Sequence, residues 1–252
     1  MNAIDDGSIY ANPSLLSSFI VLSYADLKKY KFHYWFGFPA IHSDPPWSLA
    51  DVTHGSIYGQ GQSSNTRNLT HQESSSIVDA VHSWSATVDS CQRGFFLAKK
   101  SSDLSGRDYA GNNANRQDGA RFSWKIASLG EYDRGFFDGV GFENSYICFA
   151  DPSNYASAPG WMLRNLLVLV KRRWGLNKIQ VLLFRDVRSK PLLGRSVAMI
   201  LETKQRNTLA HDIRSHDAAD QAKPKITGWE RNPSGKLTGR MVDLTEYMDP
   251  KR

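Results

Sequence analysis

The segment Pro159–Gly175, which reads PGWMLRNLLVLVKRRWG, constrains the fold more than any other stretch of the chain. Its apolar side chains recur at helical spacing, and this predicts a largely buried helix from Trp161 to Trp174. The basic residues 171–173 fall in the last turn, where the helix dipole favours cations, and Gly175 is the expected stop. An apolar stripe of this kind is typical of a core helix, so the pattern alone assigns it no functional site.

Strand-like runs flank this helix on both sides. The run YICFA covers residues 146–150 before it, and the run IQVLLF covers residues 179–184 after it. A strand, a buried helix and a second strand in this order predict a βαβ-like unit.

A second strong pattern is the run Phe32–Ile41, in which every second residue from 32 to 38 is aromatic. A period of two with this aromatic content predicts a half-buried strand. We expect Pro39 to end this strand or to place it at a sheet edge. The alternative is a row of aromatic rings that stacks on nucleic-acid bases.

The other elements have weaker patterns. Helical spacing at residues 73–88 follows Thr70, a residue type that favours the N-cap position. Further strands are predicted at residues 94–98, 120–129 and 196–203.

Two stretches have the composition of surface insertions. Residues at about 43–70 and 100–143 are rich in polar residues and glycine, which predicts long mobile insertions there. Residues 204–225 are also polar, and we expect a loose segment. The chain is therefore predicted to form an α+β domain, with a mixed β-sheet, a few packed helices and long surface insertions.

Length and composition are those of an ordinary globular protein, with 252 residues of which 40% are hydrophobic and 22% charged. No apolar run approaches the ~20 residues of a membrane span, and the start MNAIDDGSIY lacks the apolar core of a signal peptide. We expect no membrane span, no secretion and a cytoplasmic location. Cys91 and Cys148 are too few for a disulfide framework or a cysteine-rich zinc site.

The formal net charge of +6 has two interpretations. One is a nucleic-acid-binding module that uses the basic excess and the aromatic residues. The other is a solvated basic surface. We favour the second, and expect no nucleic-acid partner, because the basic residues are scattered and never form a run of four.

The sequence lacks the motifs that mark common catalytic and nucleotide-binding sites. It contains no GxGxxG, no P-loop and no GxSxG. The pairs His211-Asp212 and His216-Asp217 are five residues apart, whereas helical metal ligands are four apart. We therefore predict no catalytic, cofactor-binding or metal-binding residue in this chain.

Several segments together carry a family resemblance. They are Asn12-Pro13 with Leu15-Leu16, ADLKKY (25–30), YWFGFPA (34–40), Asp151-Pro152, PGWMLRNLLVL (159–169), Arg173-Trp174, FRD (184–186), GWE (228–230) and DPKR (249–252). In this order they resemble the N-terminal domain of the autophagy-related protein 7 family. These are the E1-like enzymes that activate the ubiquitin-like modifiers of autophagy.

The resemblance implies that the chain, residues 1–252, is this N-terminal domain, incomplete at its own N-terminus. Family members begin with an earlier lobe and continue after the DPKR segment into an adenylation domain with the nucleotide-binding glycines and the catalytic cysteine. ATP and magnesium would be used in that domain, which is absent here. We therefore expect neither a cofactor nor activating activity in this chain alone.

The resemblance also implies partners and a location. In the family, the N-terminal domain recruits the conjugating enzymes autophagy-related proteins 3 and 10. The full-length enzyme acts on the modifiers autophagy-related proteins 8 and 12, and its location is the preautophagosomal structure in the cytoplasm. The alternatives to a docking role are the nucleic-acid-binding module and a non-functional truncated gene product.

Four residues inside the matching segments are the predicted partner-binding residues: Trp161, Arg164, Trp229 and Glu230. Aromatic anchors with a polar rim are what a docking groove for a partner helix or strand requires. The alternative for both tryptophans is burial in the core. For Arg164 and Glu230, and for the nearby Arg185, the alternative is internal ion pairing.

Overall fold

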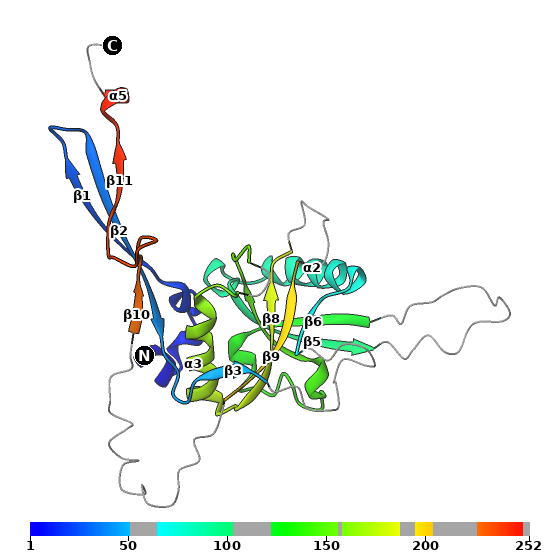
Figure 1. Ribbon diagram of the computed structural model, residues 1–252. Coiled ribbons are helices and arrows are strands. Elements are labelled where there is room, and N and C mark those ends of the chain that lie inside the picture. The colour runs from blue at the N-terminus through cyan, green and yellow to red at the C-terminus, as the bar shows by residue number, and fades with distance from the viewer. Residues whose placement is uncertain (51–64, 103–121, 156–157, 187–194, 204–225, 249–252) are drawn as a thin grey trace, which may run out of the picture.

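The computed structural model describes residues 1–50, 65–102, 122–155, 158–186, 195–203 and 226–248. Within these residues the chain forms two β-sheets. A seven-stranded sheet with helices on both faces makes up the body, and a four-stranded sheet projects from one side of it (Figure 1). The predicted α+β class, with a mixed sheet and a few packed helices, is confirmed.

The centre of the body is formed by β7 (Ser145–Ala150), α3 (Met162–Trp174) and β8 (Lys178–Phe184). The two strands are neighbours and run parallel, so the predicted βαβ-like unit is confirmed. Gly175 follows α3 in the left-handed conformation with a φ of 66°. Glycine adopts this conformation at little cost, which explains why the helix ends there.

Antiparallel strands complete the sheet on both sides of this unit. β9 (Val197–Thr203) pairs with β8. On the other side β5 (Phe95–Ser102) pairs with β7, and β6 (Phe122–Ser128) pairs with β5. All three strands are present where the residue patterns predict them.

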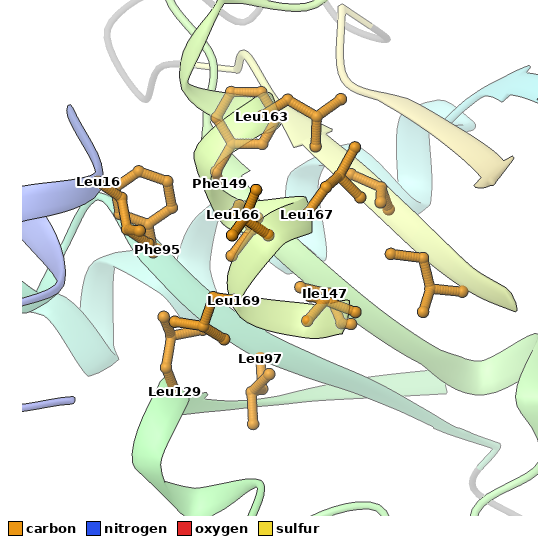
Figure 2. Packing of buried hydrophobic residues seen from close by; sticks show 14 of the residues in the cluster. Leu16, Phe95, Leu97, Leu129, Ile147, Phe149, Leu163, Leu166, Leu167 and Leu169 are labelled. Carbon is orange, nitrogen blue, oxygen red and sulfur yellow. The ribbon is translucent and has the colours of Figure 1, made fainter. Parts of the chain in front are cut away.

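One face of the sheet is covered by α3 together with three short N-terminal elements, α1 (Asn2–Asp5), η1 (Ser8–Tyr10) and η2 (Pro13–Ser17). In Figure 2 the leucines 163, 166, 167 and 169 of α3 lie over side chains of β5 and β7. The helix is therefore a core element, as its stripe predicts.

The polar stretch 43–70 is more than a surface insertion. It contains β3 (Trp47–Leu49) and β4 (Thr66–Asn68), which both pair with β9 and extend the sheet. A strand of three residues is too short to show an alternation of apolar and polar residues. The polar composition of the stretch therefore gives no sign of these two strands. Residues 51–64 lie outside the described part of the chain.

The stretch 100–143, also predicted to be a long insertion, contains regular secondary structure. It includes the end of β5, all of β6 and the short helical turns η5 (Leu129–Glu131) and η6 (Phe142–Asn144). Residues 103–121 and the predicted loose segment 204–225 lie outside the described residues.

The second face of the sheet is covered by α2 (His71–Ser85). Thr70 is its N-cap, as predicted: the Thr70 hydroxyl accepts a hydrogen bond from the Glu73 amide at 3.2 Å, and the Glu73 carboxylate accepts one from the Thr70 amide at 2.9 Å. This reciprocal capping box satisfies two backbone donors that the first turn would otherwise leave unpaired.

Glu73 also holds two basic residues of neighbouring strands. Its carboxylate is 2.8 Å from Arg67 of β4 and 2.9 Å from Lys100 of β5, and the residue is only 4% exposed. Burial would raise the pKa of Glu73, but the hydrogen bonds from Arg67, Lys100 and the Thr70 amide outweigh burial and lower the pKa to about 2. The ionised carboxylate therefore ties α2 to the sheet.

The projecting sheet is built around β2 (Lys31–Ile41), the predicted aromatic strand. β1 (Ile20–Asp26) pairs along one side of it, and β11 (Arg240–Asp243) and β10 (Ile226–Trp229) pair in succession along the other. α5 (Thr245–Met248) lies at the turn between β1 and β2, where the Thr245 hydroxyl donates to the carbonyl of Lys29. The C-terminal stretch has no clear periodicity, yet it supplies two strands and this helix.

Pro39 does not end β2, which continues to Ile41, but it lies at a local edge, as predicted. The pairing with β1 ends at Gly37, and beyond it β10 is the one strand that pairs with β2 in the described residues. The pairing with β10 shifts between Thr227 and Trp229, which leaves two residues of β2, Phe38 and Pro39, opposite the single residue Gly228. A bulge of this kind tolerates a residue without an N–H. Gly228 has a φ of 147°, and a Cβ there would lie 1.8 Å from a carbonyl oxygen of β2, so the bulge requires glycine.

The lowered pKa of Glu73 predicts a specific pH dependence of stability. Because the pKa falls from 4.5 to about 2 on folding, the ionised carboxylate stabilises the fold above pH 4.5, and this stability is lost as the pH falls towards 2. The loss should be about 3 kcal/mol.

Urea denaturation at neutral and acidic pH measures this contribution. Glu73→Gln should be less stable at neutral pH and should lack this part of the acid dependence. Glu131→Gln, at an exposed ion pair with Arg134, is the matched control and should keep the wild-type profile. Identical pH profiles for both variants would contradict the role of Glu73.

Candidate functional site

The side chains of the projecting sheet alternate between two faces, and both faces are apolar. The phenylalanine face carries Val21, Tyr34, Phe36, Phe38 and Val242. The tryptophan face carries Leu22, Tyr24, Trp35, Trp229 and Met241. An antiparallel sheet that is solvated on one side alternates apolar and polar residues, so apolar residues on both faces are unusual.

On the phenylalanine face, aromatic rings form a row that runs from β2 to the start of α3. The ring centroids of Tyr34 and Phe36, and those of Phe36 and Phe38, are 6.5 Å apart. The ring of Phe38 is in turn 5.8 Å from that of Trp161, the N-cap residue of α3. The Arg240 guanidinium lies 5.6 Å from the centroid of Phe36, at cation–π distance.

On the tryptophan face, two indole rings pack over glycines. A Cβ added at Gly37 would lie 3.4 Å from the ring of Trp229, and one added at Gly239 would lie 2.7 Å from the ring of Trp35. The second distance leaves no room for a side chain, so Gly239 permits this packing. Trp229 nevertheless remains 43% exposed.

An ion pair lies on the phenylalanine face beside the aromatic row. The Glu230 carboxylate oxygens are 3.1 and 3.2 Å from Nε of Arg240, and the Glu230 amide donates to the carbonyl of Phe36 at 2.9 Å. The hydrogen bond from Arg240 lowers the pKa of Glu230. Because the pair is exposed to solvent, it orients Arg240 over the rings more than it stabilises the fold.

A buried amide side chain helps to fix this sheet to the body. Asn165 of α3 donates hydrogen bonds to the carbonyls of Leu16 at 2.8 Å and Pro39 at 2.9 Å, and it accepts one from the amide of Ile41 at 2.8 Å. Since Asn165 is only 4% exposed, these bonds are made away from water, where an unpaired partner would be costly.

The structure does not gather the four predicted partner-binding residues into one site. Trp161 is half-buried against the phenylalanine face, whereas Trp229 is exposed on the tryptophan face. Arg164 is exposed on α3, and the described residues supply no ion-pair partner for it. Glu230 is paired with Arg240. Their role in partner binding stays a prediction.

Arg185, the further basic residue of the matching segments, has an internal role. It forms a buried ion pair with Asp151 at 2.8 Å. The other oxygen of Asp151 accepts hydrogen bonds from the amides of Ser153 at 3.0 Å and Gly160 at 2.9 Å. A shallow hollow lined by residues 152–155 and 158–160 lies beside this carboxylate. The hydrogen-bonding capacity of Asp151 is used within the protein, by Arg185 and by the two amides.

Other candidate chemistry is sparse in the described residues. They include no cluster of three or more His, Cys, Asp or Glu side chains placed to hold a metal ion. His211 and His216 lie outside the described ranges. Burial raises the pKa of the Cys148 thiol well above its usual value, which keeps it protonated and unreactive. Among the helices that the structure describes, none is long and apolar enough to cross a membrane.

The residue patterns missed Asn165 and Arg240. Asn165 interrupts the apolar stripe of residues 161–174 with a polar side chain, and this interruption is the one signal that could have marked it. Arg240 carries no such signal, because only the pairing of β11 with β2 places it over Phe36.

Removal of the Asn165 amide should uncouple the projecting sheet from the body. Asn165→Ala leaves the Ile41 amide and two carbonyls without their partner, so we expect a loss of about 3 kcal/mol in the free energy of unfolding. Asn165→Asp retains the shape but cannot donate to the two carbonyls, so it should be at least as destabilising at neutral pH.

Amide hydrogen exchange distinguishes this coupling from a general loss of stability. Exchange at Ile41 should accelerate more in Asn165→Ala than exchange in β7 and β8. Equal acceleration throughout would show that Asn165 is an ordinary core residue.

Comparisons with known proteins add to these observations. The family model described as "Ubiquitin-like modifier-activating enzyme ATG7 N-terminus" matches residues 1–248. The chain is 51% identical, over 252 residues, to ubiquitin-like modifier-activating enzyme atg7 of Emericella nidulans, and the match covers 100% of this chain and 34% of that protein. The identity to the corresponding protein of Ajellomyces capsulatus is 48% over 263 residues, covering 100% of this chain and 36% of that protein.

The chain therefore spans about a third of the length of these curated relatives. Among solved structures, it is similar to the crystal structure of a Kluyveromyces marxianus Atg7NTD–Atg10 complex, with a TM-score of 0.48 and 18% sequence identity. That match covers 97% of this chain and 68% of the solved chain.

Proposed function

Because the chain belongs to the family of the ubiquitin-like modifier-activating enzyme ATG7, through its N-terminal part, we propose that it docks conjugating enzymes of autophagy. The partners we propose are autophagy-related proteins 3 and 10. Docking next to an activating enzyme raises the effective concentration of the conjugating enzyme that receives the modifier. Activation of autophagy-related proteins 8 and 12 would belong to the full-length enzyme.

The observation that supports docking most strongly is the exposed apolar surface of the projecting sheet. Many of the large apolar side chains that the described residues expose lie on its strands or directly beside β1: Phe19, Ile20, Val21, Leu22, Tyr24, Leu27, Ile226, Trp229, Met241 and Val242. Contiguous exposed apolar surface with a polar rim is typical of protein interaction sites. Here Glu230, Arg240 and Arg164 supply polar groups around it.

The proposed docking residues are Trp161, Arg164, Trp229 and Glu230, which lie on both faces of the sheet. A partner that contacts all four must reach around the sheet, and an extended or partly unfolded segment can do so. Such a segment is ordered only on binding, and this ordering weakens the affinity. We therefore expect dissociation constants in the micromolar range.

The proposal assigns no chemistry to this chain alone. Adenylation with ATP and magnesium, and capture of the modifier on a cysteine, would take place elsewhere in the longer enzyme. The location we propose is the cytoplasm, at the preautophagosomal structure. Incubation of this chain with ATP, magnesium and the modifier should give neither pyrophosphate exchange nor a thioester.

Calorimetric titration of the chain with autophagy-related proteins 3 and 10 tests the docking role. We expect binding of at least one of them, weakened about tenfold or more by Trp161→Ala and by Trp229→Ala, because buried tryptophans carry much of the energy of such interfaces. Leu49→Ala is the matched control. It removes an apolar residue that is 52% exposed on β3 of the body, and it should leave the affinity unchanged.

Two outcomes would contradict this role. The first is the absence of heat with either protein from a chain that unfolds cooperatively. The second is binding of a single-stranded oligonucleotide that weakens steeply as salt rises, which would favour the nucleic-acid-binding alternative suggested by the net charge of +6.

A further inference from the structure

The strand β1 lies at an open edge of the projecting sheet. Within the described residues it pairs only with β2, along all seven residues from Ile20 to Asp26. Figure 1 shows β1 at the outer border of this sheet, with β2 between it and β11. About half of its backbone N–H and C=O groups therefore face away from β2, where a further strand could pair with them.

The edge formed by β1 lacks the features by which proteins normally block strand addition. Residues 20–25 read IVLSYA and contain neither a charge nor a proline. The one charged residue of β1 is Asp26, which is its last residue and is paired with Lys29. The opposite edge has several such features: β10 and β11 have four residues each, the pairing of β10 with β2 is interrupted by a bulge opposite Gly228, and Arg240 and Asp243 place charges on β11. Short strands, bulges and charges protect an edge from pairing. Of the two edges of this sheet, the β1 edge is therefore the one suited to pair with an added strand.

The side chains of β1 would support an added strand on both faces. Val21 is 41% exposed on the phenylalanine face, and Leu22 and Tyr24 are 54% and 61% exposed on the tryptophan face. Apolar residues of a neighbouring strand would cover these side chains in cross-strand pairs. An added strand would thus gain apolar contacts as well as backbone hydrogen bonds.

Charges at the end of β1 favour one direction of the added strand. Lys28 and Lys29 follow the strand in the turn to β2, while residues 7–19, which precede it, carry no charge. Lys29 pairs with Asp26 at 3.6 Å, and the described residues offer no ion-pair partner to the exposed Lys28. An antiparallel strand begins beside the end of β1, so acidic residues that precede it would lie near Lys28.

We propose that β1 accepts an extended segment of a partner protein as an additional antiparallel strand. The segment is uncharged and rich in β-branched residues where it pairs, and acidic residues precede it. This inference goes beyond the docking of conjugating enzymes, because it concerns one sheet edge and holds whichever protein supplies the strand.

A synthetic peptide of two aspartates followed by alternating valine and threonine is the probe. We expect it to bind the chain in a fluorescence titration, and the version with both aspartates at the C-terminal end to bind several-fold more weakly. Two N-methylated versions, methylated on the odd or on the even residues, isolate the backbone contribution. In strand addition only alternate amides face the neighbour, so one version should lose binding and the other should keep it.

Substitution of two matched valines tests which edge of the sheet binds the peptide. Val21 and Val242 lie on the same face, opposite Phe36 and Phe32 of β2, and are 41% and 42% exposed. Val21→Glu on β1 should abolish peptide binding, whereas Val242→Glu on β11 should reduce it only slightly through charge repulsion. Circular dichroism should show both variants folded, and the methylated peptides test the unsubstituted chain independently.

Three results would overturn the proposal. Equal binding of the two methylated peptides would exclude backbone pairing. Equal loss of binding in both valine variants would place the peptide elsewhere. Self-association that Val21→Glu abolishes, in a chain that binds no peptide, would assign the edge to a second copy of this chain instead.

Discussion

The hydrogen bonds of Asn165 are the interaction on which the placement of the projecting sheet against the body most depends. This one side chain joins α3 to the carbonyls of Leu16 and Pro39 and to the amide of Ile41. Leu16 and Ile41 lie in the segments through which the chain enters and leaves the pair β1 and β2. The buried amide therefore fixes the direction in which the sheet leaves the body, and with it the placement of the aromatic row against Trp161.

The body and the projecting sheet are stabilised in different ways. The body buries apolar side chains on both faces of its sheet, beneath α3 and α2, and its internal charges are paired, as Glu73 and Asp151 show. Among the described residues, the helical contact with the faces of the projecting sheet is that of Trp161, at the start of α3, with Phe38, and the charges of the sheet lie at its rim and tip. A sheet that keeps apolar side chains on both faces loses the usual benefit of burial unless another polypeptide covers it. This contrast supports our proposal that partners dock on the projecting sheet, while the body supplies the stability.

The residue patterns predicted those elements whose stability comes from regular burial. The unit β7–α3–β8, the aromatic strand β2 and the cap at Thr70 each have a local signal, because periodicity and capping act within a few residues. Pairings between distant segments have no such signal. The positions of β4, β10 and Arg240 depend on partners far away in the sequence. For the same reason, nothing local indicates that Trp161 and Trp229 lie on opposite faces.

Amide hydrogen exchange of the chain, measured with and without saturating autophagy-related protein 10, tests most directly whether the projecting sheet is a docking surface. If it is, binding should slow exchange in β1, in β2 and at the start of α3 next to Trp161, and should leave β6 and α2 on the far side of the body unchanged. Slower exchange confined to β6 and α2, with the projecting sheet unaffected by the bound protein, would contradict this account.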